Sequence, residues 1–377
     1  MKKILLLIIL SALSVKVSAQ TAEIEFMPDT VIQNNKNVIN ISVNIKGVTN
    51  LFASSITVEY DNRVINVIKF SKGSFLEQNS GANTVQYEVY PDFPALADSF
   101  TVDASILGTS SVSGNGTLFR LSFQPVAGGQ TFLKIRDIKL RDNNNNPIPV
   151  STGTSFIRID VAGVKVKCFL EGAFNGSNMS ANLLDYLPFV QPYSAAPWNY
   201  SGTESVSNNF FNNHWDIVDW VLLELRSTTA AGSLVSRRAA LLKRDGSIVD
   251  MDGSSPVNFF VPAANYYVIV RHRNHIPVMS AVTVALTSSP VLYDFTTGQG
   301  QAYGTNSMIA LTGGIFGIIA GEDSHDGFID IRDFIGIDNS MFQSGYSNHD
   351  TNMDGFIDIR DFIKVDNNMF LGSNVPN

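Results

Sequence analysis

The segment DGFIDIRDFIGIDNSMF at residues 326–342 returns almost unchanged as DGFIDIRDFIKVDNNMF at residues 354–370. The two copies are identical at 14 of 17 aligned positions and are offset by 28 residues. Each copy starts with acidic residues and a glycine and continues into a stretch in which apolar residues recur every three or four positions. This pattern predicts a loop followed by an amphipathic helix, so we expect the end of the chain to contain two equivalent loop–helix units.

The loop of the second copy, DTNMDGFIDIRD at residues 350–361, has oxygen-bearing side chains at loop positions 1, 3, 5, 9 and 12 and a glycine at position 6. In an EF-hand calcium loop, side-chain oxygens at such positions and the main-chain carbonyl of position 7 surround a hard cation, while the glycine permits a sharp turn. The spacing therefore predicts a Ca2+ site. Its expected ligands are Asp350, Asn352, Asp354, the carbonyl of Phe356, Asp358 and Asp361.

The loop of the first copy, EDSHDGFIDIRD at residues 322–333, follows the same pattern with weaker ligands at its start, namely glutamate at position 1 and serine at position 3. We therefore expect two Ca2+ sites, of which the second is the stronger. The first loop either binds less tightly or uses Asp323 after a local rearrangement, and the alternative for both loops is an acidic segment that stays solvated. The expected ligands of the first site are Glu322, Ser324, Asp326, the carbonyl of Phe328, Asp330 and Asp333.

The repeat departs from a standard EF-hand in two ways. Position 12 is aspartate rather than glutamate, and no helix is expected before the second loop because the GYS of residues 345–347 leads directly to Asp350. Together these features resemble a dockerin, the paired loop–helix module of cellulosome-type assemblies, over about residues 320–371. The resemblance implies a small, calcium-dependent helical module that docks into a cohesin-bearing protein.

The resemblance also implies a partner surface. In dockerins the residues just before loop position 12 carry recognition, and here these are Ile331 with Arg332 and Ile359 with Arg360. Because the two halves present the same pair, the resemblance implies a pseudo-symmetric surface that can meet one partner in either of two orientations. The alternative is that Ile331 and Ile359 complete the small apolar core of the module.

The start of the chain has the pattern of a cleavable targeting segment. Two lysines precede an apolar run at residues 4–10, and small residues follow at positions 17–19, which predicts a secretory signal peptide over residues 1–19. We therefore expect a secreted protein of a bacterium, either extracellular or at the cell surface. No apolar run reaches the roughly 20 residues of a membrane-spanning helix, and the glycine-broken residues 308–320 are expected to be a strand and a linker.

Charge and cysteine content narrow the class of protein further. Residues 320–371 contain eleven acidic and three basic residues, in a chain whose formal net charge is −8. This distribution favours cation binding and speaks against nucleic acid as a partner. Cys168 is the single cysteine, so no intramolecular disulfide is possible, and apolar cores and calcium are expected to stabilise the protein.

Residues 20–162 are expected to form an antiparallel β-sandwich, because short β-prone runs alternate with turn signals and no long helical stretch interrupts them. The order of the runs ISVNIKGV, SSITVEYD, VINVIKF, TLFRLSFQPV, TFLKIRDIKL and FIRIDV, with GSFL between the third and fourth, resembles a cohesin. This implies a domain that receives dockerin-bearing proteins, although Asp61-Asn62 stands where cohesins commonly have Asp-Pro. Related sandwiches bind carbohydrate, so polysaccharide is the alternative ligand.

Residues 163–315 are expected to form an accessory β-sandwich from runs such as WDIVDWVLLELRS and YYVIVRHRNH, with hairpin turns at the two Asp-Gly pairs at residues 245–246 and 252–253. These runs resemble a module of secreted surface proteins of Bacteroidetes-like bacteria. The segment RHRNH at residues 271–275 follows a strand and is expected to be a polar turn. His214, His272 and His275 are not expected to bind metal, because no HExxH or carboxylate spacing accompanies them.

The sequence thus predicts a mainly β protein with two tandem β-sandwich domains and a dockerin-like, EF-hand-like helical module at residues 316–377. We expect a secreted, noncatalytic adaptor or scaffold that assembles extracellular, polysaccharide-related complexes through calcium-dependent docking. Two alternatives stay open: a carbohydrate-binding surface protein anchored by its dockerin, and a glycoside hydrolase or esterase with its site in the middle domain. Carboxylates alone do not establish such a site, and we expect Asp216 and Asp219 to be ordinary strand-edge groups.

Overall fold

The computed structural model describes residues 21–79, 85–91 and 97–376, so the predicted signal peptide lies outside the described residues. The chain divides into two compact units, Met1–Ile159 and Asp160–Asn377. The predicted middle domain and C-terminal module therefore belong to one unit, whereas the sequence had suggested two separate domains. Among the described residues, no helix is long and apolar enough to cross a membrane.

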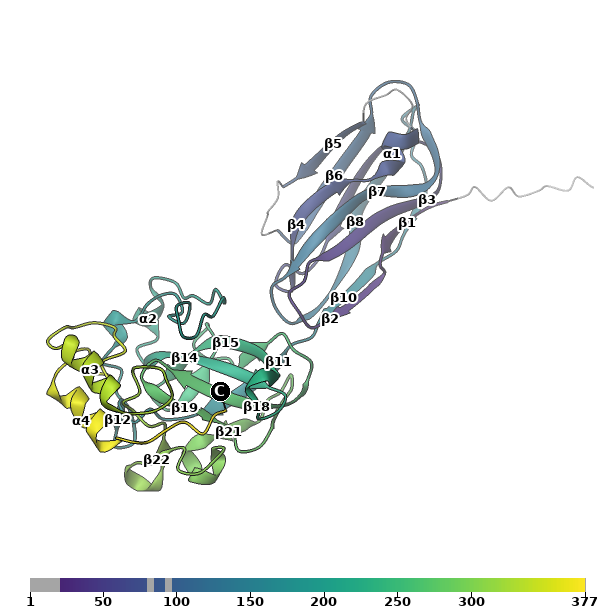
Figure 1. Cartoon of the computed structure of the whole chain (residues 1–377). Helices are drawn as coiled ribbons and strands as arrows, with labels where there is room; N and C mark the ends of the chain where they lie inside the picture. The colour runs from purple at the N-terminus through teal and green to yellow at the C-terminus, as the bar shows by residue number, and fades with distance from the viewer. Residues whose placement is uncertain (1–20, 80–84, 92–96, 377) are drawn as a thin grey trace, which may run out of the picture. The chain divides into compact units, whose positions relative to one another are not determined.

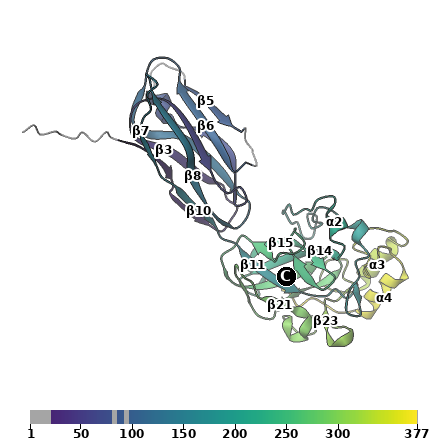
Figure 2. The ribbon, with the colours of Figure 1, turned by 180° about the vertical axis from the view of Figure 1, so that it is seen from behind.

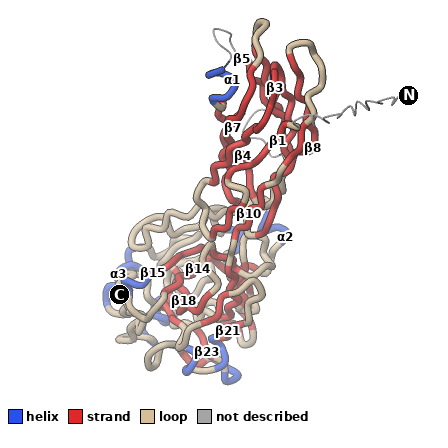
Figure 3. Tube along the Cα trace, turned by 90° about the vertical axis from the view of Figure 1, so that its right-hand side faces the viewer, coloured by secondary structure: helices blue, strands red, loops and turns tan. Residues whose placement is uncertain are grey.

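The N-terminal unit is built almost entirely of strands, as the red segments of Figure 3 show. One short helix, α1, interrupts the strands described in this unit. The elements are β1 (Ala22–Met27), β2 (Thr30–Gln33), β3 (Ile39–Glu59), β4 (Ile65–Lys72), α1 (Ser74–Asn79), β5 (Val85–Tyr90), β6 (Ser99–Ile106), β7 (Val112–Pro125), β8 (Gly129–Asp142), β9 (Val150–Thr152) and β10 (Ser155–Ile159).

The long strand β3 connects the two layers of this sandwich (Figure 1). Its first half pairs with β1 and β7, and its second half, from Leu51 onward, pairs with β6 and β8. The sequence suggested two strands with a turn between them at this point. The structure instead bends one strand through irregular pairing at residues 45–51, where Gly47 and Asn50 adopt left-handed backbone angles of φ 63° and 55°.

Alternation along the strands builds the core of the sandwich. Phe119, Leu121 and Phe123 of β7 are buried, while Arg120 is exposed and Ser122 half-buried between them, as predicted. Because successive side chains of a strand point to opposite faces, the same alternation leaves the outer face of the sheet polar. The mainly β prediction is confirmed for this unit.

The second unit combines a β-sheet with long loops and two C-terminal helices. Its strands are β11 (Ala162–Lys167), β12 (Phe174–Asn175), β13 (Asn178–Met179), β14 (Ile217–Arg226), β15 (Leu234–Lys243), β16 (Ser247–Val249), β17 (Val257–Phe259), β18 (Ala264–His272), β19 (His275–Met279), β20 (Val284–Leu286), β21 (Leu292–Asp294), β22 (Ile309–Ala310) and β23 (Phe316–Gly317). Its helices are α2 (Phe210–Asn213), α3 (Ile331–Asn339) and α4 (Ile359–Asn367), with 3-10 turns at Leu184–Tyr186, Ala231–Ser233, Phe295–Thr297, Gln299–Gln301 and Thr312–Gly314.

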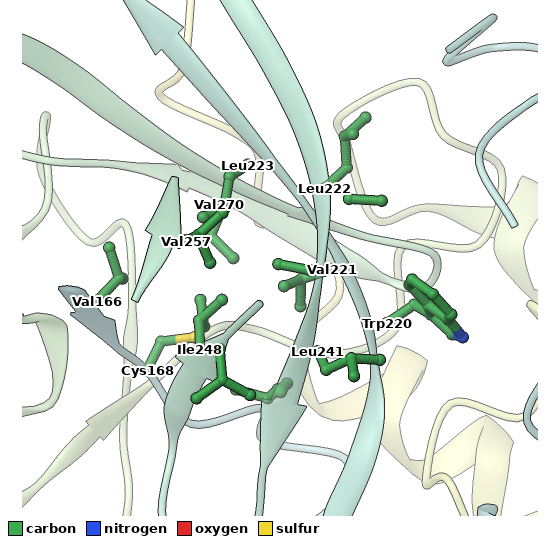
Figure 4. Close-up of a cluster of buried hydrophobic side chains, with 14 of the residues drawn as sticks. Val166, Cys168, Trp220, Val221, Leu222, Leu223, Leu241, Ile248, Val257 and Val270 are labelled. Atoms are coloured by element: carbon green, nitrogen blue, oxygen red, sulfur yellow. The ribbon is translucent and has the colours of Figure 1, made fainter. Parts of the chain in front are cut away.

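One curled sheet forms the middle of this unit, in the order β17-β11-β16-β15-β14-β18-β19. β20 pairs with β18, and Thr287, just after β20, bridges to Gly163 of β11, so the two ends of the sheet approach each other. We predicted a sandwich of two sheets for this region, whereas the structure has one curled sheet. Every residue of the central strand β14 is buried, and Trp220, Val221 and their neighbours fill the core in Figure 4.

Residues 308–320 do not form the predicted strand and linker. β22 and β23 make a small hairpin, and the following residues Ile318, Ile319 and Ala320 are buried. Ile318 bridges to Leu170, and Ala320 bridges to His275 of β19. This segment is therefore part of the core and ties the C-terminal helices to the sheet.

Candidate docking surfaces

The two predicted calcium loops have the same backbone conformation. At loop position 4, His325 and Met353 have φ values of 61° and 60°, and at position 6, Gly327 and Gly355 have values of 85° and 88°. The position-6 angle lies in the left-handed region, which glycine adopts without strain, so the sequence correctly identified this residue as the turning point. We call residues 322–371, which contain both loops and the helices α3 and α4, the loop–helix repeat.

The aspartate at position 12 closes each loop. Asp361 accepts hydrogen bonds from the amide of Asn352 at the loop start (3.0 Å) and from the amide of Asp358 at the helix start (2.9 Å). Asp333 does the same in the first loop, accepting from the amides of Ser324 and Asp330 at 2.9 Å each. Each carboxylate also completes a capping box at the N-terminus of its helix.

The two halves interlock through their backbones and a small core. Ile357 of the second loop exchanges backbone hydrogen bonds with residues 342–343 after α3, and Ile329 of the first loop exchanges them with residues 370–371 after α4. α3 and α4 lie side by side (Figures 1 and 2), and the rings of Phe334 and Phe362 stack with centroids 5.4 Å apart. The predicted apolar stripe is thus confirmed for its inner residues, including the fully buried Ile337 and Val365.

The carboxyl groups at the start of each loop are buried, and their pKa values are raised. Burial, together with the nearby Asp361 carboxylate, raises the pKa of Asp350 to about 6, although Arg273 and backbone amides act in the opposite direction. Burial also raises the pKa of Asp361, and it raises the pKa of Glu322 in the first loop to about 7. Carboxylates in such positions are stabilised by a neighbouring positive charge.

The first loop differs from the second at its entrance. Glu322 takes the place of Asp350, accepting from the amide of Gly327 (3.2 Å) as Asp350 accepts from that of Gly355 (2.9 Å). The carboxylate of Asp323 points away from the loop and binds His349 Nδ1 at 2.6 Å. The structure therefore gives Glu322 the position-1 role and keeps Asp323 outside the loop.

Two arginines engage the middle of the loops. Arg360 forms ion pairs with Asp354 (2.9 Å) and Asp358 (2.7 Å), and Arg332 pairs in the same way with Asp326 and Asp330. The hydrogen bonds from the arginines hold the pKa values of Asp330 and Asp358 below the ordinary range. Within the described residues, no three His, Cys, Asp or Glu side chains are grouped closely enough to hold a metal ion.

The predicted partner residues lie on the surface in both halves. Ile331 and Ile359 are each 64% exposed, which excludes the alternative that they complete the core of the module. Ile335 and Ile363, one helical turn further, are 53% and 51% exposed, so each helix presents an apolar pair beside its arginine. The exposed residues match pairwise between the halves, and exposed Phe342 and Phe370 continue the match beyond the helices.

A second candidate surface lies on the N-terminal sandwich, on the outer face of the strands β8-β3-β6-β5. Two rows of side chains cross these strands in register. They are Lys139-Ser55-Asp103-Glu88 and Arg141-Ala53-Ser105-Gln86. The rows line a shallow trough of about 490 Å³.

The trough has a floor of small residues and walls of opposite charge. Lys139 and Arg141 stand on β8 at one side, and Glu88 stands on β5 at the other. Asp103 Oδ1 is buried and has no hydrogen-bond partner among the described residues. A surface of this kind suits a protein ligand with a protruding side chain and a hydrogen-bond donor, and it lacks the row of exposed aromatic rings expected of a sugar-binding face.

Comparison with known proteins identifies the N-terminal region. A family model for the cohesin domain matches residues 24–156, so this region is a cohesin domain. Similar solved structures include a non-cellulosomal cohesin from the archaeon Archaeoglobus fulgidus, with 18% identity, 37% of this chain and 91% of that chain covered, and a TM-score of 0.30. A type II cohesin of the Acetivibrio cellulolyticus cellulosome has 16% identity, coverages of 36% and 95%, and a TM-score of 0.32.

A third similar structure is a type I cohesin–dockerin complex from Clostridium thermocellum, with 21% identity, coverages of 37% and 99%, and a TM-score of 0.30. These similarities cover 36–37% of the chain. A search of curated proteins finds no match.

The structure also shows polar residues whose role the sequence did not reveal. The segment at residues 271–275 was expected to be a polar turn and Asp219 a strand-edge group. The turn is present, but His272–His275 are at most 3% exposed, and Asp219 is fully buried beneath them. A run of charged and amide residues predicts exposure unless its partners are known. Here the partners lie far along the chain: Tyr346 is 127 residues from Asp219, and Asp350 is 76 residues from Asn274.

Two buried carboxylates of the middle region, Glu224 and Glu171, are bound by neighbouring donor groups. Glu224 binds Arg226 at 2.5 Å through one oxygen and Arg271 at 2.9 Å through the other. Glu171 accepts from the amide of Ala320 (3.0 Å) and from Asn368 (2.7 Å). Both carboxylates are thus bound to arginine, amide or backbone donors within the fold.

Proposed function

We propose that the protein is a secreted, noncatalytic adaptor with two docking surfaces: the cohesin domain receives a dockerin-bearing protein, and the loop–helix repeat docks into a cohesin on another protein. The observation that carries this proposal is the matched exposure of the Ile-Arg pairs at residues 331–332 and 359–360, on a chain that also contains a cohesin domain. A cellulosome-type, protein–protein adaptor is the role that the cohesin domain itself indicates.

We further propose that the repeat binds calcium through the predicted ligands. The donors of the second loop are all oxygens. Burial raises the pKa of Asp350 and of Asp361, and a neighbouring carboxylate adds to each shift, that of Asp361 for Asp350 and that of Asp354 for Asp361. Calcium would supply the positive charge that these carboxylates lack. Arg360 must then release Asp354 and Asp358, and this costs little because the ion pairs of a solvent-exposed arginine contribute little to stability.

The chain's own residues support recognition in two orientations. A half-turn that exchanges α3 and α4 exchanges Ile331 with Ile359 and Arg332 with Arg360, so one partner groove can accept either half. Arginine is one of the residue types enriched at the energetic centres of interfaces.

We also propose that the protein is secreted and that the complexes it assembles act on or bind polysaccharide. The predicted signal peptide and the adaptor role indicated by the cohesin domain motivate an extracellular, polysaccharide-related setting. The second candidate, a sugar-binding cohesin-like sandwich, is disfavoured by the polar, ring-poor trough on β8-β3-β6-β5.

Binding by the full chain tests both surfaces. Calorimetry against a panel of dockerin modules, its own repeat included, should show binding that Asp103→Ala or Lys139→Glu weakens, whereas soluble glycans should give no heat. Binding of glycans in the absence of any dockerin binding would contradict the adaptor and favour the sugar-binding alternative.

A further inference from the structure

Both loops of the repeat rest on one tight turn of the middle sheet, His272–His275 between β18 and β19, which we call the seat. We propose that Arg273 and Asn274 of the seat are positioning residues for the two loops: they fix the loop backbones from outside and thereby raise the calcium affinity and the rigidity of the repeat. This inference rests on the proposed function of the repeat and goes beyond it, because it assigns a role to the middle domain.

The sheet holds Arg273 firmly. Its Nε donates to Asp219 Oδ2 at 3.1 Å, and the other oxygen of Asp219 accepts from the amide of Trp220 and the hydroxyl of Tyr346, each at 2.7 Å. Burial alone would raise the pKa of Asp219, but Arg273, His272 and Tyr346 outweigh it and keep the pKa below its ordinary value. The carboxylate therefore stays charged and anchors the guanidinium.

The seat binds the entrance of the second loop. Arg273 Nη1 donates to the carbonyl of Ser347, and the guanidinium lies over the ring of Tyr346, 4.5 Å from its centroid. Asn274 Nδ2 donates to the carbonyl of Asp350, the residue at loop position 1, at 2.5 Å. The backbone leading into the loop is thus held at two carbonyls by the seat.

The same arginine binds the first loop through its backbone. The carbonyl of Arg273 accepts from His325 Nε2 at 2.6 Å, and His325 is the residue at position 4 whose φ of 61° shapes the turn. The ring of His325 packs edge-on against Trp198, with centroids 4.4 Å apart. Arg273 therefore contacts the first loop through its backbone and the segment that leads into the second loop through its side chain.

The contact leaves no spare space at the second loop. The amide of Gly172 donates to His275 Nε2 at 3.1 Å, and a side-chain carbon at Gly172 would lie 2.1 Å from the carbonyl oxygen of Thr351, at loop position 2. Only glycine permits this approach. An alanine there must push the second loop off the seat, because the obstructing atom belongs to the backbone.

Fixing the loop from outside has a direct energetic consequence. The carboxylates of an empty calcium loop repel one another. If the loop backbone is already ordered before calcium binds, less conformational entropy is lost on binding and the calcium affinity is higher. The partners that orient metal ligands typically change affinity by roughly 10- to 100-fold when they are removed. The seat achieves this while it leaves both exposed pairs, at residues 331–332 and 359–360, free for a partner.

The test uses the full chain and three variants. Gly172→Ala pushes the second loop away. Arg273→Lys keeps the positive charge beside Asp219 but removes the planar guanidinium group that donates to both Asp219 and Ser347. Gly232→Ala is the matched control, since a side-chain carbon at Gly232 meets no atom within 4 Å. Calcium titration by calorimetry is combined with amide hydrogen exchange of residues 346–351 in chelator, a readout that needs no metal.

We expect Gly172→Ala and Arg273→Lys to weaken calcium binding at the second loop by roughly 10- to 100-fold and to speed exchange there, while β14 stays protected. Arg273→Lys keeps the backbone carbonyl that binds His325, so the first loop should change little, which a general loss of stability would not reproduce. Gly232→Ala should resemble the unaltered chain.

Unchanged exchange and unchanged calcium affinity in Gly172→Ala and Arg273→Lys would overturn the role of the seat. If Gly172→Ala fails to fold, Arg273→Lys alone decides. Absence of calcium binding in the unaltered chain would instead refute the proposed function, and the exchange measurement in chelator would still show whether the seat orders the loop.

Discussion

The two halves of the loop–helix repeat are nearly identical at their helices and different at their loop entrances. Ile331 and Ile359 have the same exposure, and Ile329 and Ile357 are equally buried. At the entrances, however, Glu322 and Ser324 replace the Asp350 and Asn352 of the second loop. Under the proposed function, the molecule has two equivalent docking faces beside two unequal calcium loops, so recognition and metal binding would be carried by separate residues.

The interlocking of the halves explains why this separation is possible. Each loop pairs with the segment after the other helix, Ile329 with residues 370–371 and Ile357 with residues 342–343. We therefore propose that an ion bound in the second loop would support both halves of the core, so that the first loop could have weaker ligands without loss of its helix.

The largest effect is expected from removing both docking faces. Changing Ile331, Arg332, Ile359 and Arg360 together to alanine should weaken partner binding more than about 100-fold, the effect of losing two interface hot spots. Changing one pair alone should cost only about twofold, because one of two equivalent orientations survives. A large loss from one single-pair variant, measured by calorimetry against the same cohesin, would mean that only one face is used.

Two variants that each remove one carboxylate from one loop should show which loop forms the tighter calcium site. Asp354→Ala should lower the calcium affinity of the second loop by at least roughly 10- to 100-fold, the range seen when even outer partners of a ligand are lost. The matched variant Asp326→Ala should affect only the weaker, first site. Equal effects of the two variants in a calcium titration would argue against the ranking of the loops.

The buried isoleucines test whether the halves share one core. Ile329→Ala and Ile357→Ala should each lower the free energy of unfolding by about 2–4 kcal/mol, because each leaves a cavity in the same small cluster. Thermal or denaturant unfolding of the second unit measures the effect. A loss confined to one variant would show that the halves are stabilised independently.

The smallest effect is expected from repairing the first loop. Glu322→Asp together with Ser324→Asn gives it the entrance of the second loop, so its calcium affinity should rise by about three- to tenfold, as ligand charge and count tune such loops. The second site serves as the internal control, since its ligands are unaltered. If the calcium affinity of the first loop does not rise, the cause of its weaker binding lies outside Glu322 and Ser324.

Local patterns in the sequence were sufficient to predict the sandwich and the repeat. Period-2 alternation at Phe119–Phe123 and the glycines at loop position 6 act through the conformation of their own segment, so the residues alone determine the result. The continuity of β3 was missed, because Gly47 and Asn50 are typical of a turn and also suit a bend within a strand.

Long-range polar contacts could not be predicted in the same way. Asp219, Arg273 and Glu171 are buried only because Tyr346, Ser347 and Asn368, more than 70 residues further along the chain, supply their partners. A single sequence contains no sign of such pairing, and buried charged residues are rare. For the same reason the close association of the repeat with the middle sheet became visible only in three dimensions.

A calcium titration of the full chain by calorimetry tests the central claim most directly. The account predicts two bound ions, a tighter one that Asp354→Ala removes and a weaker one that Asp326→Ala removes, with partner binding lost in chelator. A chain that binds no calcium, or that docks equally well with and without chelator, would contradict the account.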